Sequence, residues 1–300
     1  MNMSSKRPAH MMRRGLGRAF FYLMVLAILL YILAPVAWMF LSTILWETDF
    51  VRLSSDLEIP KSINFDYYVT LLFPWIPTKV EYGVFGGSWF LIKSVTDTTI
   101  VALATTAVTL VLGVLAAYPL ARIRFPRRSG VLTFLVVVQM IPGLAILIPI
   151  FIIMRSLGLI DTFPGYILPL ATYFAPFVAW MMVGFFQSTP VELEDQAIVD
   201  GCSRWGALTK IVLPLVAPGL VASAVWAFLS SWGEFMFAIV LTGSRVTPIS
   251  VLIALAVGEV QARWGWMCAQ AIIALLPPVV LALLLQKYLV KGLTAGAIKG

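Results

Sequence analysis

Residues 98–121 read TTIVALATTAVTLVLGVLAAYPLA, and none of them is charged. An α-helix needs about 20 predominantly apolar residues to cross the hydrocarbon core of a bilayer. A charge-free stretch of this length is therefore typical of a membrane-spanning helix. The whole chain has the same character, because 61% of its 300 residues are hydrophobic and only 12% are charged. That balance argues against a water-soluble globular enzyme, in which about 25% of the residues are charged.

Five further charge-free intervals are long enough to span a bilayer. They cover residues 19–46, 129–154, 162–191, 211–233 and 264–286, and the interval at 211–233 continues past Glu234 to Ser244. A seventh interval, Val246–Gly258, is too short to span and favours a re-entrant or interfacial segment. The sequence therefore predicts an all-α polytopic membrane protein with six transmembrane helices in one domain over residues 19–291.

The basic residues predict the orientation of these helices. Most of the 21 Lys and Arg residues lie in the tail 1–18, the link 122–128, the link 204–210 and the segment after residue 286. The positive-inside rule places these segments in the cytoplasm. Both termini, including the tail 292–300, are then cytoplasmic, and residues 47–88 form an external loop. The net charge of +7 is explained by the membrane surface, without a nucleic-acid partner.

Several kinds of catalytic site have no support in the sequence. The only histidine is His10, and the two cysteines, Cys202 and Cys268, lie far apart. These residues predict neither a metal site nor a His-dependent catalytic triad. No Gly-Lys dipeptide occurs in the sequence, so it contains no P-loop for binding ATP. We expect no catalytic residues, no metal and no cofactor on this chain.

The most informative link joins the fourth and fifth predicted spans. Residues 187–219 read QSTPVELEDQAIVDGCSRWGALTKIVLPLVAPG. Ser188 or Thr189 can cap the N-terminus of a short helix. The helix would end at Asp200-Gly201, since glycine accepts the left-handed backbone of a helix C-terminus. The helix has an apolar stripe of Leu193, Ala197 and Ile198, and acids in its first turns. Because helices that bind a membrane surface are usually basic, this acidic one predicts docking to a protein; the alternative is an ordinary loop on the headgroups.

The same link resembles the EAA loop of permease subunits of ATP-binding-cassette (ABC) importers. Asp195-Gln196-Ala197, Asp200-Gly201, Ile211 and Leu213-Pro214 follow that pattern, with Asp in place of Glu, Gln in place of the first Ala, and Cys202 in place of Ala. More specifically, the chain resembles carbohydrate-importer permeases of the MalG type. The segments that carry this resemblance are 116–122 with Phe125-Pro126, then 157–159, 232–235 and the C-terminal 292–300.

The resemblance implies a type I ABC importer permease fold, in the inner membrane of a bacterial or archaeal cell. It implies a heterodimer with a second homologous permease subunit, two ATPase subunits that bind ATP and Mg²⁺, and an extracytoplasmic substrate-binding protein. The coupling loop would cover residues 188–213, and the C-terminal tail would lie at the ATPase interface. The residues that match the coupling loop are Glu192, Glu194, Asp195, Ala197, Asp200, Gly201, Leu213 and Pro214.

Two further groups are candidates for contact with substrate or with the binding protein. Glu234 interrupts the fifth apolar run between Trp232 and Phe235, where it would either accept hydroxyl protons of a sugar or pair with another helix. Gln139 and Gln270 are weaker candidates, since an amide in a membrane helix often bridges two helices. The segment 258–264 reads GEVQARW, and its Glu259, Gln261 and Arg263 would reach into the binding protein or form a solvated connector.

The sequence thus predicts a permease subunit that forms half of the pathway for a sugar, oligosaccharide or polyol and is driven by a separate ATPase. One alternative is the same architecture carrying glycerol 3-phosphate, which an acid in the pathway would disfavour by repulsion. A second alternative is a stand-alone secondary transporter or channel. A membrane enzyme is the weakest interpretation, because no paired carboxylates or nucleophile setting is present.

Overall fold

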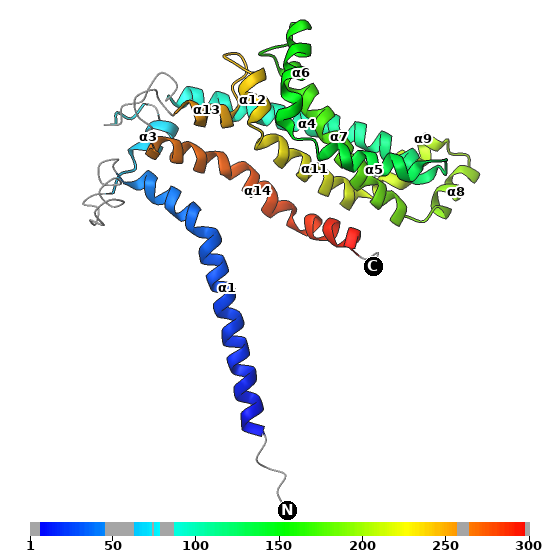
Figure 1. Ribbon diagram of the computed structural model, residues 1–300, viewed down its shortest axis with the longest axis horizontal. Coiled ribbons are helices and arrows are strands. Elements are labelled where there is room, and N and C mark those ends of the chain that lie inside the picture. Colours follow the sequence, from blue (N-terminus) through cyan, green and yellow to red (C-terminus); the bar gives the residue numbers. More distant parts are fainter. Residues whose placement is uncertain (1–6, 46–62, 74, 79–86, 257–263, 298–300) are drawn as a thin grey trace, which may run out of the picture. The chain divides into compact units, whose positions relative to one another are not determined.

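The computed structural model describes residues 7–45, 63–73, 75–78, 87–256 and 264–297 (Figure 1). All regular elements among these residues are helical. They are α1 (Arg7–Ile44), α3 (Asp66–Leu72), α4 (Ser88–Arg122), α5 (Arg128–Gln139), α6 (Gly143–Ser156), α7 (Phe163–Ser188), α8 (Glu192–Val199), α9 (Arg204–Ala207), η1 (Leu208–Val212), α10 (Leu213–Leu215), α11 (Ala217–Trp232), α12 (Met236–Leu241), α13 (Ile249–Leu255) and α14 (Trp264–Ala297). Two compact units emerge, one of residues 1–81 with 258–272 and one of 82–257 with 273–300.

The prediction of a helical, multi-span membrane protein is confirmed. Four helices are long and apolar enough to cross a membrane, at Phe20–Ile44, Ser88–Arg122, Phe163–Ser188 and Trp264–Lys287, and two bent helix pairs bring the number to as many as six. In the first pair, α5 and α6 meet at 89°. Pro142 precedes α6, and because proline has no backbone N–H it cannot continue the helical hydrogen bonds of α5.

The fifth predicted span is divided more finely than the sequence suggested. Residues 211–215 belong to an arm, Arg204–Leu215, that bends by 79° from α11. After α11 the chain breaks at Gly233 and Glu234, and α12 begins at Met236. The interval at 246–258 was predicted to be too short to span, and its described part, residues 246–256, carries the seven-residue α13.

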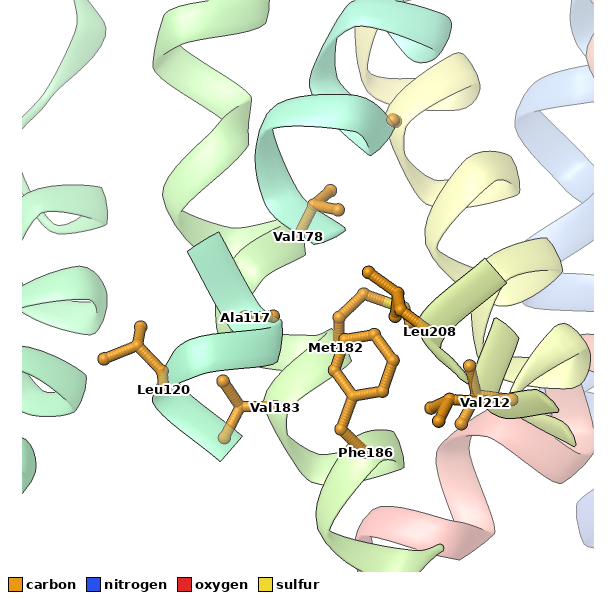
Figure 2. Close-up of a cluster of buried hydrophobic side chains, with 10 residues drawn as sticks. Ala117, Leu120, Val178, Met182, Val183, Phe186, Leu208 and Val212 are labelled. Carbon is orange, nitrogen blue, oxygen red and sulfur yellow. The ribbon is translucent and has the colours of Figure 1, made fainter. Parts of the chain in front are cut away.

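In the larger unit, α4, α7 and α11 pack together along their lengths (Figure 1). Gly113 lets α4 and α7 approach closely, because a Cβ at this position would collide with Val178. At the end of these helices near α8, Met182 and Phe186 of α7 meet Leu208 and Val212 in one buried cluster (Figure 2). Residues of η1 therefore anchor the link between α7 and α11 in the core of this unit.

At the opposite end of α4, two carboxylates hold the loop 242–248 between α12 and α13. Asp161, in the turn before α7, accepts hydrogen bonds from the backbone N–H groups of Arg245 and Val246, both at 3.0 Å. Asp97 of α4 accepts one from Thr247 N–H at 2.9 Å and pairs with Lys93 at 2.6 Å. This i, i+4 pair has a buried aspartate, which also fastens a loop about 150 residues further along the chain.

In the smaller unit, α3 packs on the first turns of α14. The rings of Tyr67 and Trp266 meet edge to face, with centroids 6.2 Å apart. The hydroxyl groups of Thr43 and Tyr68 share a hydrogen bond of 2.8 Å. Burial raises the pKa of Tyr68, although the hydrogen bond from Thr43 opposes that shift. The end of α1 and the start of α14 thus form one small core with α3.

Asp161→Asn should lower the melting temperature of the purified protein in detergent. Burial raises the pKa of Asp161, but hydrogen bonds from backbone N–H groups of residues 243–246 outweigh it and hold the pKa below its usual value. Because the folded-state pKa is depressed, the stabilisation is present above the ordinary aspartate pKa of about 4 and is lost as the pH falls through the folded-state value. Loss of charged hydrogen bonds of this kind costs about 1–3 kcal/mol.

The melting temperature of the wild-type protein should therefore fall more steeply with acidification than that of Asp161→Asn. Asp195→Asn makes the same chemical change at an exposed position and serves as the control. Equal pH slopes for the wild-type protein and Asp161→Asn would contradict the role assigned to Asp161.

Candidate functional site

The link between α7 and α11 begins with α8, whose C-terminus is closed by glycine. Gly201 has a φ of +91°, a conformation that residues with a Cβ rarely adopt. Its N–H donates to Ile198 O at 3.1 Å, and Cys202 N–H donates to Ala197 O at 2.9 Å. This is the Schellman pattern of a helix C-terminus. Ser203 then caps α9 by accepting Gly206 N–H at 3.1 Å, so the reversal of the chain predicted at Gly201 is confirmed.

The N-terminus of α8 and its buried face differ from the prediction. The hydroxyl groups of Ser188 and Thr189 donate back to Phe185 O, so neither residue caps α8. Leu193 and Ile198 of the predicted apolar stripe are exposed, whereas Ala197 and Glu194 are buried. An acid therefore occupies the face of α8 that was expected to be apolar.

Glu194 is buried because α4 supplies partners for both of its carboxylate oxygens. Arg122 Nε donates to Glu194 Oε2 at 2.8 Å, and the Tyr118 hydroxyl donates to Oε1. Arg122 Nη1 also donates to Thr189 O at 3.1 Å, which fixes the end of α7. The side chain of Glu194 is only 8% exposed and that of Arg122 only 9%. Glu194 therefore faces α4, although the sequence grouped it with residues that contact an ATPase.

The opposite side of α8 is acidic and exposed. We call it the acidic face of α8, and it consists of Glu192, Asp195, Gln196, Val199 and Asp200, which line one surface hollow. Their spacing of three and four residues places them on one side of a helix. Val199, the last residue of α8, is 86% exposed on this face. Three carboxylates around an exposed apolar side chain suit a basic protein surface better than an anionic lipid surface.

The remaining residues of the predicted coupling loop lie between α8 and α11. Leu213 is half-buried and packs on the cluster of Figure 2, whereas Pro214 is exposed. Leu208 and Val212 of η1 are deeply buried in that cluster. The link is therefore fastened at two places, through Glu194 on α8 and through the apolar residues of η1.

Glu234 occupies the break between α11 and α12. Its carboxylate accepts the N–H groups of Phe237 at 2.9 Å and Ala238 at 3.1 Å, the first free donors of α12. Tyr166 donates its hydroxyl to the same carboxylate at 3.1 Å, and Ser250 donates to Glu234 O at 2.8 Å. Of the two interpretations of Glu234, these contacts favour the structural one, in which the acid is satisfied by neighbouring helices.

The other predicted pathway residues also make contacts within the chain. Trp232 is buried, stacks on Phe228 and donates its indole N–H to Ala274 O at 3.1 Å. Gln139 donates to Tyr173 O at 2.5 Å, as an amide that bridges two helices would. Phe235 is half-buried at the break beside Glu234.

Two predicted contact regions are described only in part. Glu259, Gln261 and Arg263 lie outside the described residues, so their contact with a binding protein stays a prediction. The C-terminal segment 292–300 continues α14 as far as Ala297. Among the described residues, no three His, Cys, Asp or Glu side chains are grouped so that they could hold a metal ion.

Comparison with known proteins identifies the family. Residues 109–295 match the family described as binding-protein-dependent transport system inner membrane component. The chain belongs to this family. This permease is 36% identical over 231 residues to the sulfoquinovosyl glycerol transport system permease protein SmoH of Agrobacterium fabrum, which covers 76% of this chain and 80% of that protein. It is 33% identical over 276 residues to the trehalose transport system permease protein SugB of Mycobacterium tuberculosis, covering 90% and 93% of the two chains.

The fold of the permease is also known from solved structures. A chain of a bacterial ABC transporter involved in the import of the acidic polysaccharide alginate superposes with a TM-score of 0.72. The two chains are 21% identical, and the match covers 96% of this permease and 99% of that chain. The predicted family, the importer permease fold and the location in the cell membrane as a multi-pass protein are confirmed.

Sequence reasoning missed three residues that hold the permease together. In the sequence, Tyr118 and Arg122 stand out only as parts of the motif 116–122 and of the basic link 122–128, and Asp161 was assigned no role. All three act on residues more than 65 positions away in the chain. One weak signal in the sequence indicates that two of them have partners. Arg122 and Asp161 lie directly beside predicted spans, where an unpaired charge is costly.

Glu234→Ala should lower the melting temperature of the permease in detergent, without any sugar present. The substitution leaves two N–H groups of α12 without their side-chain acceptor, which costs about 0.5–2 kcal/mol for a helix cap. Glu192→Ala removes an exposed acid from the first turn of α8 and should have a smaller effect. If Glu234 acted only on substrate, its removal would leave the melting temperature of the sugar-free protein unchanged, and that result would contradict the structural role.

Proposed function

We propose that this permease forms half of the translocation pathway of an ABC importer and that the acidic face of α8 docks on a separate ATPase subunit. The observation that carries the proposal is the division of α8 into a buried face and an exposed acidic face. The buried face is held by Arg122 and Tyr118 of α4, which gives α8 a fixed position. The acidic face projects three carboxylates outward, as a surface for a basic partner would.

The substrate that we propose is a sugar, an oligosaccharide or a polyol. SmoH and SugB are named for transport of sulfoquinovosyl glycerol and trehalose, which supports a carbohydrate for this permease. Glu234 no longer argues against an anionic substrate such as glycerol 3-phosphate, because its carboxylate is occupied by α12 and Tyr166. We therefore base the proposed substrate class on the relatives alone.

The remaining parts of the importer would be supplied by other chains. A second homologous permease would complete the pathway, two ATPase subunits would bind ATP and Mg²⁺, and an extracytoplasmic binding protein would deliver the substrate. Glu259, Gln261 and Arg263 would contact that binding protein. A stand-alone carrier remains the alternative, and it would need no docking surface of this kind.

The orientation follows from the charges around α8. Exposed Arg124, Arg127, Arg204 and Lys210 accompany the C-terminal end of α4 and the link that carries α8. Because basic residues accumulate on the cytoplasmic side of membrane proteins, we place α8 and both termini in the cytoplasm. Residues 47–88, together with the loop 242–248 at the other end of α4, are then external.

Cysteine labelling tests this orientation. In a Cys202→Ser and Cys268→Ala background, Val199→Cys should react with a membrane-impermeant maleimide in inverted vesicles but not in intact cells with a permeabilised outer envelope. Trp75→Cys, also strongly exposed at 74%, should show the reverse pattern, since it lies in the predicted external loop. Labelling of Val199→Cys from outside would overturn the orientation and the docking proposal together.

Charge reversal on the acidic face tests the proposed docking. The double variant Glu192→Lys, Asp195→Lys should lower the affinity of the permease pair for its ATPase about 100-fold or more, because juxtaposed like charges cost several kcal/mol. The amount of ATPase that co-purifies with the tagged permease measures this effect. Arg155→Glu reverses an exposed charge at the end of α6 and should leave co-purification unchanged.

Equal recovery of the ATPase with the wild-type permease and with the double variant would refute docking on this face. Full transport by the purified chain without any ATPase would instead favour a stand-alone carrier.

A further inference from the structure

We propose that Glu194 is a positioning residue that fastens α8 to the end of α4, so that α8 moves together with α4 during transport. The proposal rests on the proposed function, because it assigns a role to a residue beside the docking surface. It differs from the expectation for Glu194 in the sequence, which grouped this residue with those that touch an ATPase.

The first support is that the carboxylate of Glu194 is fully engaged within the chain. Arg122 Nε and the Tyr118 hydroxyl donate to different oxygens of the carboxylate. Both donors come from the last turns of α4, and both partners of the ion pair are buried. Because the Glu194 side chain is only 8% exposed and both of its oxygens accept donors of this chain, it is shielded from a basic residue of another subunit, whereas Glu192 and Asp195 remain exposed.

The second support is that Arg122 joins three elements at one point. While Nε holds Glu194 of α8, Nη1 donates to Thr189 O at the end of α7. The planar guanidinium can donate in two directions at once, which a lysine ammonium on a single flexible stem does less precisely. The ends of α4 and α7 and the start of α8 are therefore fixed to one another by one side chain.

The third support is that α4 has a matching attachment at its other end. Asp97 accepts Thr247 N–H at 2.9 Å, and the Thr98 hydroxyl accepts Ile249 N–H at 2.8 Å. Asp97 and Arg122 are separated by roughly 40 Å along a helix with a rise of 1.5 Å per residue. A displacement of the loop 242–248 at one end of α4 would thus reach α8 at the other end through one continuous helix.

The experiment compares Glu194→Gln and Arg122→Ala with Arg124→Ala, which removes an exposed arginine two residues further along. Each permease is assembled with its partner subunits in proteoliposomes, and two quantities are measured. The first is the amount of ATPase that stays bound. The second is the factor by which the substrate-loaded binding protein stimulates ATP hydrolysis. Glu194→Gln and Arg122→Ala should retain the ATPase but reduce the stimulation factor at least fivefold, whereas Arg124→Ala should match the wild-type complex.

The double variant Glu194→Arg, Arg122→Glu restores opposite charges in exchanged positions and should regain part of the stimulation. Where a single charge variant fails to fold, Tyr118→Phe keeps the ion pair, removes one hydrogen bond and should lower the stimulation factor by a smaller amount. Unchanged stimulation in Glu194→Gln and Tyr118→Phe would overturn the proposal. Loss of the ATPase from Glu194→Gln would also overturn it, since Glu194 would then be a docking residue.

These outcomes separate the two proposals. If reversal of Glu192 and Asp195 leaves the ATPase bound, the proposed docking face is wrong whatever Glu194 does. If that reversal releases the ATPase while the Glu194 variants behave as the wild-type complex does, only the positioning role is wrong.

Discussion

A helix that is interrupted inside or beside a membrane must find partners for its exposed backbone groups within the protein, since no water is available in the hydrocarbon core. In the larger unit of this permease, carboxylates meet that requirement at two places, the loop 242–248 and the start of α12. Asp161 binds the N–H groups of the loop 242–248, and Glu234 binds the first N–H groups of α12. Glu194 instead accepts side-chain donors, the Arg122 guanidinium and the Tyr118 hydroxyl, and so joins α8 to the end of α4. The acids that interrupt or flank the apolar runs of this chain therefore stabilise its breaks and links.

The arrangement of these attachments gives α4 a central position. It packs on α7 and α11 (Figure 1). It carries Asp97 in its first third and Arg122 as its last residue. The link between α7 and α11 depends on it twice, through the pair of Arg122 with Glu194 and through Ala117 and Leu120 in the cluster of Figure 2. A substrate that shifts the far end of α4 would therefore change the position of the proposed docking face, which is the requirement for coupling transport to a separate ATPase.

The sequence predicted the features that depend on neighbouring residues and missed those that depend on distant ones. Charge-free length was enough to find the spans, and Gly201 was enough to find the reversal after α8, because both signals are local. The span predicted at 129–154 bends by 89° at Pro142; proline explains a break there, but the angle depends on what α6 packs against. The sequence could not predict that the Glu194 side chain points toward α4, because its partner Arg122 lies 72 residues earlier. Glu234 was found as an anomaly, yet only the fold showed that Tyr166 and α12 satisfy its carboxylate.

The central claim is that this chain is one part of an importer and cannot transport alone. The most direct measurement is uptake of a radiolabelled sugar into proteoliposomes that contain this permease with its second permease, its ATPase and its binding protein. The sugar is chosen by a thermal-shift screen of that binding protein. We expect uptake to require ATP and all four components, and to stop when the ATPase or the binding protein is left out. Uptake by this permease alone, independent of ATP, would contradict the account.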